Sequence, residues 1–256
     1  MEVEFMFGAN TEAKKKATEE ILRQTRAASN VDVHRGEDDL WKLASERLCH
    51  QIKTDGSNLG KGILKVNSFI NHRVDVGLMD LCGHALADCF KGSDATLVLT
   101  AQTSGVLPAQ ACARYLDRHM IFAREKKPIT ITEAYQAGSK SHTRHCDVSL
   151  FVAKEFLTSK DKVLIVDDFL ASGTTAVALL DIVRQAGATC VGFGFLVEKE
   201  FEKGRELLLE ALKEDEGGEG KVGGGGGGGK IVCLANVVAL EGEEGGKIQL
   251  SGGRKG

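Results

Sequence analysis

The sequence has no long apolar run, no excess of one charge and no basic leader, and each absence excludes a class of protein. No stretch approaches the ~18 apolar residues that a membrane span requires. The first residues, Met1 to Glu4, lack the basic segment of a secretory signal, and several early glutamates disfavour a transit peptide. A net charge of −3 over 256 residues, with acids and bases interspersed, gives no general signal for nucleic acids or membrane surfaces. We therefore expect a cytoplasmic protein with neither of those partners.

Cysteine and tryptophan add no chemistry to this picture. The seven cysteines form no Cys-x-x-Cys pair, and most stand among apolar residues, as reduced core thiols of a cytosolic protein do. We predict no metal site built from protein side chains. The one tryptophan, Trp41, lies in a segment of helical periodicity over about residues 39–52, so we interpret it as a packing residue.

The most informative stretch runs from Val163 to Thr175. Its first four residues are apolar and mostly β-branched, which is typical of a parallel strand buried on both faces. From Ala176 onward, apolar residues recur at helical spacing. The segment between them is therefore a strand-to-helix turn, where unpaired backbone N–H groups and the positive end of a helix dipole favour a phosphate.

The residues of this turn suit an anion and a sugar. Gly173 lets the backbone approach a ligand closely. Three neighbours add hydroxyl donors: Ser172, Thr174 and Thr175. The adjacent carboxylates of Asp167 and Asp168 would repel a phosphate that they faced, so we expect them to face sugar hydroxyls. An ordinary turn with capping Ser and Thr is the alternative, which the combination of strand, acids and helix disfavours.

The pattern over Asp167 to Thr175 is acid, acid, three residues, Ser or Thr, Gly, any residue, Ser or Thr. It resembles the 5-phosphoribosyl-1-diphosphate (PRPP) loop of the type I phosphoribosyltransferases. The resemblance implies that the segment from Ala171 to Thr175 binds PRPP.

A second segment of the same form precedes the first. Residues 96–100 read as a buried strand, a loop follows, and Pro108 stands in the first turn of the next helix. Alone this would be a weak signal for an anion site. Beside the PRPP loop it looks like the diphosphate loop of the same family, with Ser104 and Gly105 as binding residues.

A basic segment rich in hydroxyl groups follows the predicted strand 119–123. It reaches to about residue 146, which is long for a connection between strands and indicates a lid. Arg124 and Lys126 leave the carboxyl end of that strand, where ligands of α/β sheets bind, so we expect them to be functional. For residues 138–145, a disordered loop is the alternative.

Strands alternate with helices along the chain, which predicts an α/β fold with a doubly wound, mostly parallel sheet. The two anion loops should then lie side by side at the switch point. Other elements are predicted as helices at 11–28, 78–90 and 206–212, and as strands at 63–66, 189–197, 231–240 and 247–250. We expect residues 1–36 to be an extension and residues 37–256 one domain, with a flexible glycine-rich insertion at about 214–230.

The residues alone leave the acceptor open, with Phe69, Asn71 and Lys199 as candidate stacking and hydrogen-bonding groups. Residues 63–72, 106–108, 122–124 and 197–201 look closely like bacterial-type xanthine phosphoribosyltransferases. The resemblance implies that Leu64, Asn71 and Lys199 contact xanthine, under a small hood from the N- and C-terminal segments. A lysine suits xanthine because it can donate to an oxo group. The chain departs from the pattern at Ser172, often Asn, in the lid and in the glycine insert.

The resemblance implies a homodimeric purine salvage enzyme that transfers the phosphoribosyl group of PRPP to xanthine, giving xanthosine 5′-phosphate and diphosphate. Asp167 and Asp168 would stabilise positive charge on the sugar ring. Arg124, Lys126 and Mg²⁺, bound mainly through PRPP, would stabilise the departing diphosphate.

Two alternatives stay open. A non-catalytic PRPP-binding regulator would need a DNA-binding domain with a basic face, and residues 1–36 are short and balanced in charge. A phosphoribosyltransferase for guanine, hypoxanthine, adenine or orotate is the other; Lys199 and residues 67–71 fit adenine and orotate less well.

Deleting residues 217–229 should change the free energy of unfolding by less than about 1 kcal/mol and leave turnover nearly unchanged, because loop-closure entropy varies slowly with loop length. Thermal unfolding and steady-state rates of the deletion variant would measure this, with an equal-length Gly-Ser replacement as the control. A deletion variant that unfolds would show that these residues are ordered.

Overall fold

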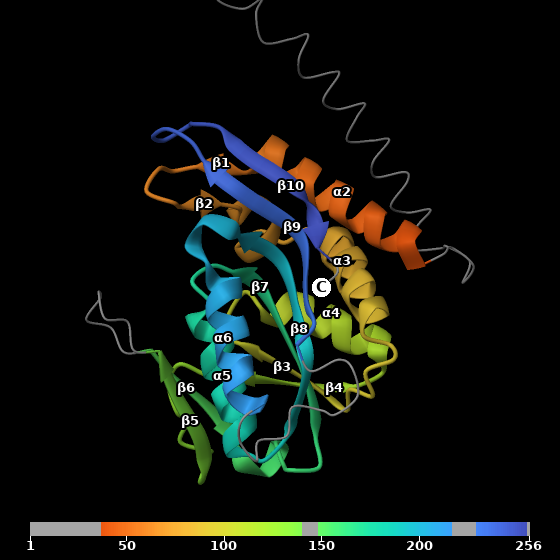
Figure 1. Cartoon of the computed structure of the whole chain (residues 1–256), viewed down its shortest axis with the longest axis vertical. Coiled ribbons are helices and arrows are strands. Elements are labelled where there is room, and N and C mark those ends of the chain that lie inside the picture. The colour runs from red at the N-terminus through yellow and green to blue at the C-terminus, as the bar shows by residue number, and fades with distance from the viewer. Residues whose placement is uncertain (1–36, 140–147, 217–228, 255–256) are drawn as a thin grey trace, which may run out of the picture. The chain divides into compact units, whose positions relative to one another are not determined.

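The central sheet has six strands in the part of the chain that the structure, a computed structural model, describes: residues 37–139, 148–216 and 229–254 (Figure 1). Their order is β10-β9-β8-β7-β3-β4, and all neighbours are parallel except β10 and β9. The strands are β3 (Leu97–Ala101), β4 (His119–Ala123), β7 (Lys162–Leu170), β8 (Thr189–Lys199), β9 (Ile231–Leu240) and β10 (Ile248–Arg254). The predicted α/β fold with a mostly parallel sheet is confirmed.

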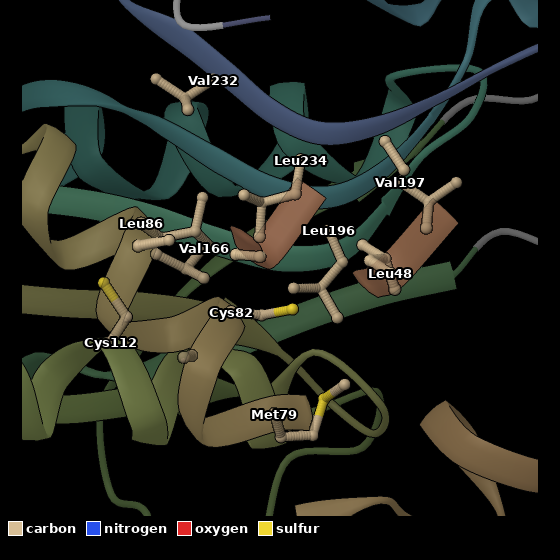
Figure 2. Packing of buried hydrophobic residues seen from close by; sticks show 14 of the residues in the cluster. Leu48, Met79, Cys82, Leu86, Cys112, Val166, Leu196, Val197, Val232 and Leu234 are labelled. Atoms are coloured by element: carbon tan, nitrogen blue, oxygen red, sulfur yellow. The ribbon is translucent and has the colours of Figure 1, made fainter. Parts of the chain in front are cut away.

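Helices cover both faces of the sheet. They are α2 (Glu37–Asp55), α3 (Val76–Cys89), α4 (Val106–Leu116), α5 (Thr174–Gln185) and α6 (Gly204–Glu216). One core cluster joins α2, α3 and α4 to the sheet, and Figure 2 shows its centre, where Leu86 and Cys82 of α3 lie near Val166, Leu196 and Leu234. The other cluster joins α5 and α6 to the opposite face.

The strand β7 shows why both faces are apolar. Leu164 and Val166 pack in the first cluster, while Val163 and Ile165 pack in the second. Successive side chains of a strand point to opposite faces, so a strand between two helix layers needs an unbroken apolar run. Each of these side chains contributes about 1.5–3 kcal/mol by leaving water.

Several predicted boundaries change. The strand β7 continues to Leu170, so Asp167 and Asp168 lie in a strand rather than in the loop, and α5 begins at Thr174 rather than at Ala176. Part of the predicted lid forms a hairpin, in which β5 (Ala134–Ser139) pairs antiparallel with β6 (Val148–Ala153). The helix α6 extends to Glu216, past the predicted start of the glycine insertion. The predicted helix 11–28 and residues 140–147 and 217–228 lie outside the described residues.

A small hood joins early and late parts of the chain. We define the hood as residues 57–72 and 240–247, which include β1 (Ser57–Asn58), β2 (Leu64–Lys65) and a π-helical turn, Asn67–Asn71. Leu59 bridges to Glu244, and the backbone nitrogen of Gly245 donates to the Asn58 carbonyl at 2.8 Å. The Asn58 side chain donates to the Glu241 carbonyl at 3.0 Å.

Four of the cysteines in the described part of the chain are buried. Cys82 and Cys112 are core residues, and burial raises the pKa of the Cys112 thiol to about 12, so it stays protonated at neutral pH. Among the described helices, none is both long and apolar enough to cross a membrane.

Gly83 allows α3 and α4 to cross closely. A Cβ atom at this position would lie 2.3 Å from the Ala111 Cβ atom and 2.8 Å from the Cys112 backbone nitrogen. The backbones of the two helices would have to separate before any side chain fitted.

Gly83→Ala should therefore lower the free energy of unfolding by about 1–3 kcal/mol through overpacking, although Ala in a helix interior is normally favoured over Gly by roughly 0.5–1 kcal/mol. Gly92→Ala is the matched control, since no atom lies within 4 Å of its added Cβ. Chemical denaturation of both variants would measure the difference. A Gly83→Ala protein at least as stable as wild type would contradict the close crossing.

Candidate active site

A pocket of about 240 Å³ opens at the carboxyl ends of β3 and β7. Its wall on one side is residues 101–104, which leave β3; on the other side it is residues 167–173, with Thr175 and Ala176 at the start of α5. From β3 the chain runs to β4, toward one edge of the sheet. From β7 it runs to β8, toward the other edge. This is the switch point of the sheet, so the two predicted anion loops do lie side by side.

The two acids form part of this pocket. Asp167 and Asp168 are each only 8% exposed, although both line it. The Asp167 Oδ1 atom accepts a hydrogen bond from the Asp168 backbone nitrogen at 2.9 Å. Burial, and then the neighbouring charge of Asp168, raise the pKa of Asp167 well above its ordinary value. A ligand that donates hydrogen bonds would satisfy these oxygens.

The loop after β7 leaves backbone donors open. Gly173 occupies the cap position of α5 with a φ of +81°, so no side chain caps the first turn of the helix. The N–H groups of that turn and the positive end of the helix dipole therefore face the pocket edge. The hydroxyls of Ser172 and Thr174 form a hydrogen bond with each other, with their oxygens 3.1 Å apart.

The loop after β3 contributes differently from the prediction. Ser104 lines the pocket, as expected, but Gly105 lies behind the pocket wall. A Cβ atom on Gly105 would come 1.9 Å from the Asp167 Oδ1 atom and 2.5 Å from the Thr100 hydroxyl. Gly105 is therefore needed for packing against the acid.

Lys199, at the end of β8, links the sheet to the hood. Its ammonium donates to the Gly62 carbonyl at 3.1 Å and to the Glu202 carboxylate at 3.0 Å. It also lies 5.7 Å from the ring centroid of Phe169, a half-buried residue that lines the pocket. The sequence reading missed Phe169, although its place directly after the two acids was a signal.

The predicted base-binding residues of the hood differ in their exposure to solvent. Phe69 is 1% exposed and packs in the core, so its ring has no open face for a base and the predicted stacking role is corrected. The π-helical turn directs Phe69 and Ile70 inward. Leu64 is also buried, whereas Asn71 is exposed at the end of the turn.

Arg124 and Lys126 are exposed and do not line the pocket. The Arg124 backbone bridges to Phe151, and its guanidinium lies 5.0 Å from the ring centroid of Phe122. Both residues follow β4, one strand away from the pocket, at the same edge of the sheet. Among the described residues, no group of three or more His, Cys, Asp or Glu side chains could hold a metal ion.

Comparison with known proteins identifies the fold and the loops together. Residues 77–208 match the model of the phosphoribosyl transferase domain. This chain belongs to the phosphoribosyltransferase family. The match spans both loops of the pocket, from α3 to the first turns of α6.

This phosphoribosyltransferase is 42% identical over 167 residues to xanthine phosphoribosyltransferase of Macrococcus caseolyticus, covering 65% of this chain and 86% of the relative. It is 44% identical over 165 residues to that of Lactobacillus delbrueckii subsp. bulgaricus, covering 64% and 87%. In fold it is similar to adenine phosphoribosyltransferase from Rhodothermus marinus, with a TM-score of 0.54, 24% identity, and coverage of 64% and 91%.

Asp167→Asn should raise the midpoint of thermal unfolding of the ligand-free phosphoribosyltransferase at pH 7. A carboxyl whose folded pKa is raised stabilises the protein least when it is ionised, so stability falls as pH rises from the unfolded pKa, about 4, through the folded pKa. The amide oxygen can still accept from the Asp168 nitrogen.

The gain from Asp167→Asn should shrink as the pH is lowered through the folded pKa and vanish below the unfolded pKa of about 4, where the wild-type carboxyl is protonated in both states. Asp39→Asn is the control, because Asp39 is exposed. Equal or lower stability of Asp167→Asn at pH 7 would argue against an unfavourable buried charge.

Proposed function

We propose that this phosphoribosyltransferase transfers the 5-phosphoribosyl group of PRPP to xanthine, giving xanthosine 5′-phosphate and diphosphate in purine salvage. The observation that carries this proposal is that the buried acid pair and the uncapped start of α5 line the same pocket. The relatives that it matches at 42–44% identity are named for this acceptor. We assign the activity to residues 37–256 and treat residues 1–36 as an extension.

The two ends of the pocket suit the two ends of a sugar phosphate. The 5-phosphate is assigned to Ala171, Ser172, Gly173, Thr174 and Thr175, where backbone N–H groups and hydroxyls can donate to it. Ring hydroxyls donate to Asp167 and Asp168, which are acceptors when ionised. Ser104, across the pocket, is on the side assigned to the diphosphate.

In the reaction, the bond from the anomeric carbon to the diphosphate oxygen breaks, a bond to a ring nitrogen of the base forms, and the proton on that nitrogen is released. Positive charge develops on the sugar ring, where the carboxylates of Asp167 and Asp168 stabilise it. Arg124 and Lys126 are assigned to the diphosphate once the segment that carries them closes over the pocket.

The pocket residues fit Mg²⁺ only as partial ligands. Carboxylate oxygens are ligands that Mg²⁺ accepts, but the pocket offers two carboxylates and no third acidic side chain. Most ligands must therefore come from PRPP itself. When bound, the ion supplies positive charge beside the diphosphate.

The base is assigned to the space between the pocket and the hood. Phe169 offers a ring at the pocket edge, and Lys199 offers a cation beside it. Leu64 and Asn71 of the hood complete the proposed acceptor side. A lysine favours an oxopurine, because it donates and cannot accept from the amino group of adenine.

Incubation of the protein with PRPP and each of xanthine, guanine, hypoxanthine and adenine, with measurement of nucleotide and diphosphate, tests the function. Xanthine should give the highest kcat/KM. Preference for another base would move the protein to another phosphoribosyltransferase activity, and PRPP binding without turnover of any base would favour a regulator. The homodimer and the cytoplasmic location stay predictions.

Lys199→Ala should lower kcat/KM for xanthine about ten- to hundredfold, since losing a charged donor to an oxo group costs on the order of 1.5–3 kcal/mol. The affinity for PRPP without base should barely change. Steady-state kinetics beside titration with PRPP would separate the two effects.

Lys230→Ala is a matched control for Lys199→Ala. Lys230 is also half-buried, donates to a backbone carbonyl (Cys89, 3.0 Å) and lies 5.5 Å from an aromatic ring centroid, that of Phe90, but it lies at the opposite end of the sheet. Equal effects of the two variants on xanthine kinetics would remove Lys199 from the base site.

A further inference from the structure

A buried ion pair joins the start of α6 to the end of β8. The Glu198 side chain is 3% exposed and that of Arg205 is 16% exposed. Arg205 donates from Nη2 to one carboxylate oxygen at 2.6 Å and from Nε to both oxygens at 2.9 and 3.1 Å. This two-pronged geometry is one that a guanidinium can make and an ammonium cannot.

The same guanidinium also reaches β9. It donates from Nη1 to the Ile231 carbonyl at 3.1 Å and from Nη2 to the Cys233 sulfur at 3.2 Å. Burial alone would lower the pKa of Arg205, but the hydrogen bonds that it donates to Glu198 and the charges of its neighbours raise it, so the guanidinium stays charged. Arg205 is thus fixed to two neighbouring strands.

The residue before Arg205 touches the phosphate loop. A Cβ atom on Gly204 would lie 2.2 Å from the Ala171 carbonyl oxygen and 2.6 Å from the Gly173 nitrogen. In return, a Cβ atom on Gly173 would lie 2.5 Å from the Gly204 carbonyl oxygen. The two backbones are in direct contact, with no space for a side chain on either glycine.

We propose that Arg205 is a positioning residue for PRPP binding: its pair with Glu198 holds Gly204 behind the backbone of residues 171–173 and so fixes the loop that receives the 5-phosphate. This rests on the proposed function of that loop. The backbone N–H groups must be aimed before the phosphate arrives, and a loop free to move would bind it more weakly.

A second arginine, from the neighbouring helix α5, supplies a comparison because it also contacts α6. Arg184 of α5 donates to the Ala211 carbonyl at 2.6 Å and to Asp181 at 2.9 Å, so it holds α6 near its middle, away from Gly204. Loss of Arg184 weakens the attachment of α6 to α5 but leaves the contact between Gly204 and residues 171–173 in place. The two arginines separate loop positioning from helix attachment.

Arg205→Lys keeps the positive charge but loses the paired hydrogen bonds from Nε and Nη2 to the Glu198 carboxylate. We expect its dissociation constant for PRPP, titrated without base, and its KM for PRPP to rise on the order of ten- to hundredfold, with a smaller change in KM for xanthine. Gly204→Ala should give the same pattern, because its Cβ pushes the loop directly. Lys199→Ala should give the opposite pattern, and Arg184→Lys should leave PRPP binding near wild type.

The double variant Gly204→Ala/Arg205→Lys distinguishes one chain of contacts from two separate effects. If both residues act through the loop, the combined loss of PRPP affinity should be smaller than the product of the single losses. Thermal unfolding of each variant identifies any that fails to fold, and the milder Arg205→Lys carries the test in that case.

Wild-type affinity for PRPP in Arg205→Lys and Gly204→Ala, or a loss that Arg184→Lys matches, would overturn the positioning role and leave the proposed function intact. Wild-type protein that does not bind PRPP would overturn the proposed function and this role together. A selective loss of PRPP affinity in both variants supports the role.

Discussion

The parallel pairing of β3 with β7 is the contact on which the site depends. Three pairs of residues hold it, from Leu97 with Val163 to Leu99 with Ile165, and both strands bury both faces. Beyond these pairs the two connections leave toward opposite edges of the sheet, so the loops part and a pocket forms between them. The close approach of Gly105 to Asp167 sets how near the loops can come. The pairing of β3 with β7 therefore determines both the order of the sheet and the position of the pocket.

The pocket combines features that folding alone would not select. A buried carboxylate next to a second one is unfavourable without a ligand, and an uncapped helix start leaves donors without partners. Both become favourable when a ligand brings hydroxyls to one and an anion to the other. Around them, Gly173 and Gly204 let two backbone segments touch, and Gly105 leaves room for the Asp167 carboxylate. The surrounding sheet and helices supply the stability that this arrangement needs.

The sequence predicts best what depends on neighbouring residues. The apolar runs of β3 and β7 follow from burial on both faces, and the loop proposed to bind phosphate lies within one short segment. Contacts between distant segments escape such reasoning. Phe69 has the character of a stacking residue, but its turn faces the core, and the approach of Lys199 to Phe169 depends on the pairing of two strands. Apolar and polar residues alternate only weakly in the hairpin of β5 and β6. No local sequence pattern predicts that Gly204 contacts Gly173.

The hood is built from an early and a late part of the chain, which affects the order of folding during synthesis. Its early half, residues 57–72, is completed by residues 240–247 through Asn58, Leu59 and their backbone partners. The ribosome releases the chain from its N-terminus, and the strands β3, β4, β7 and β8 all emerge before the late half of the hood. A nascent chain can thus pair the strands that carry the two pocket loops while the early half of the hood still lacks its late half. The residues proposed to bind the donor thus emerge before the hood that we propose encloses the acceptor is complete.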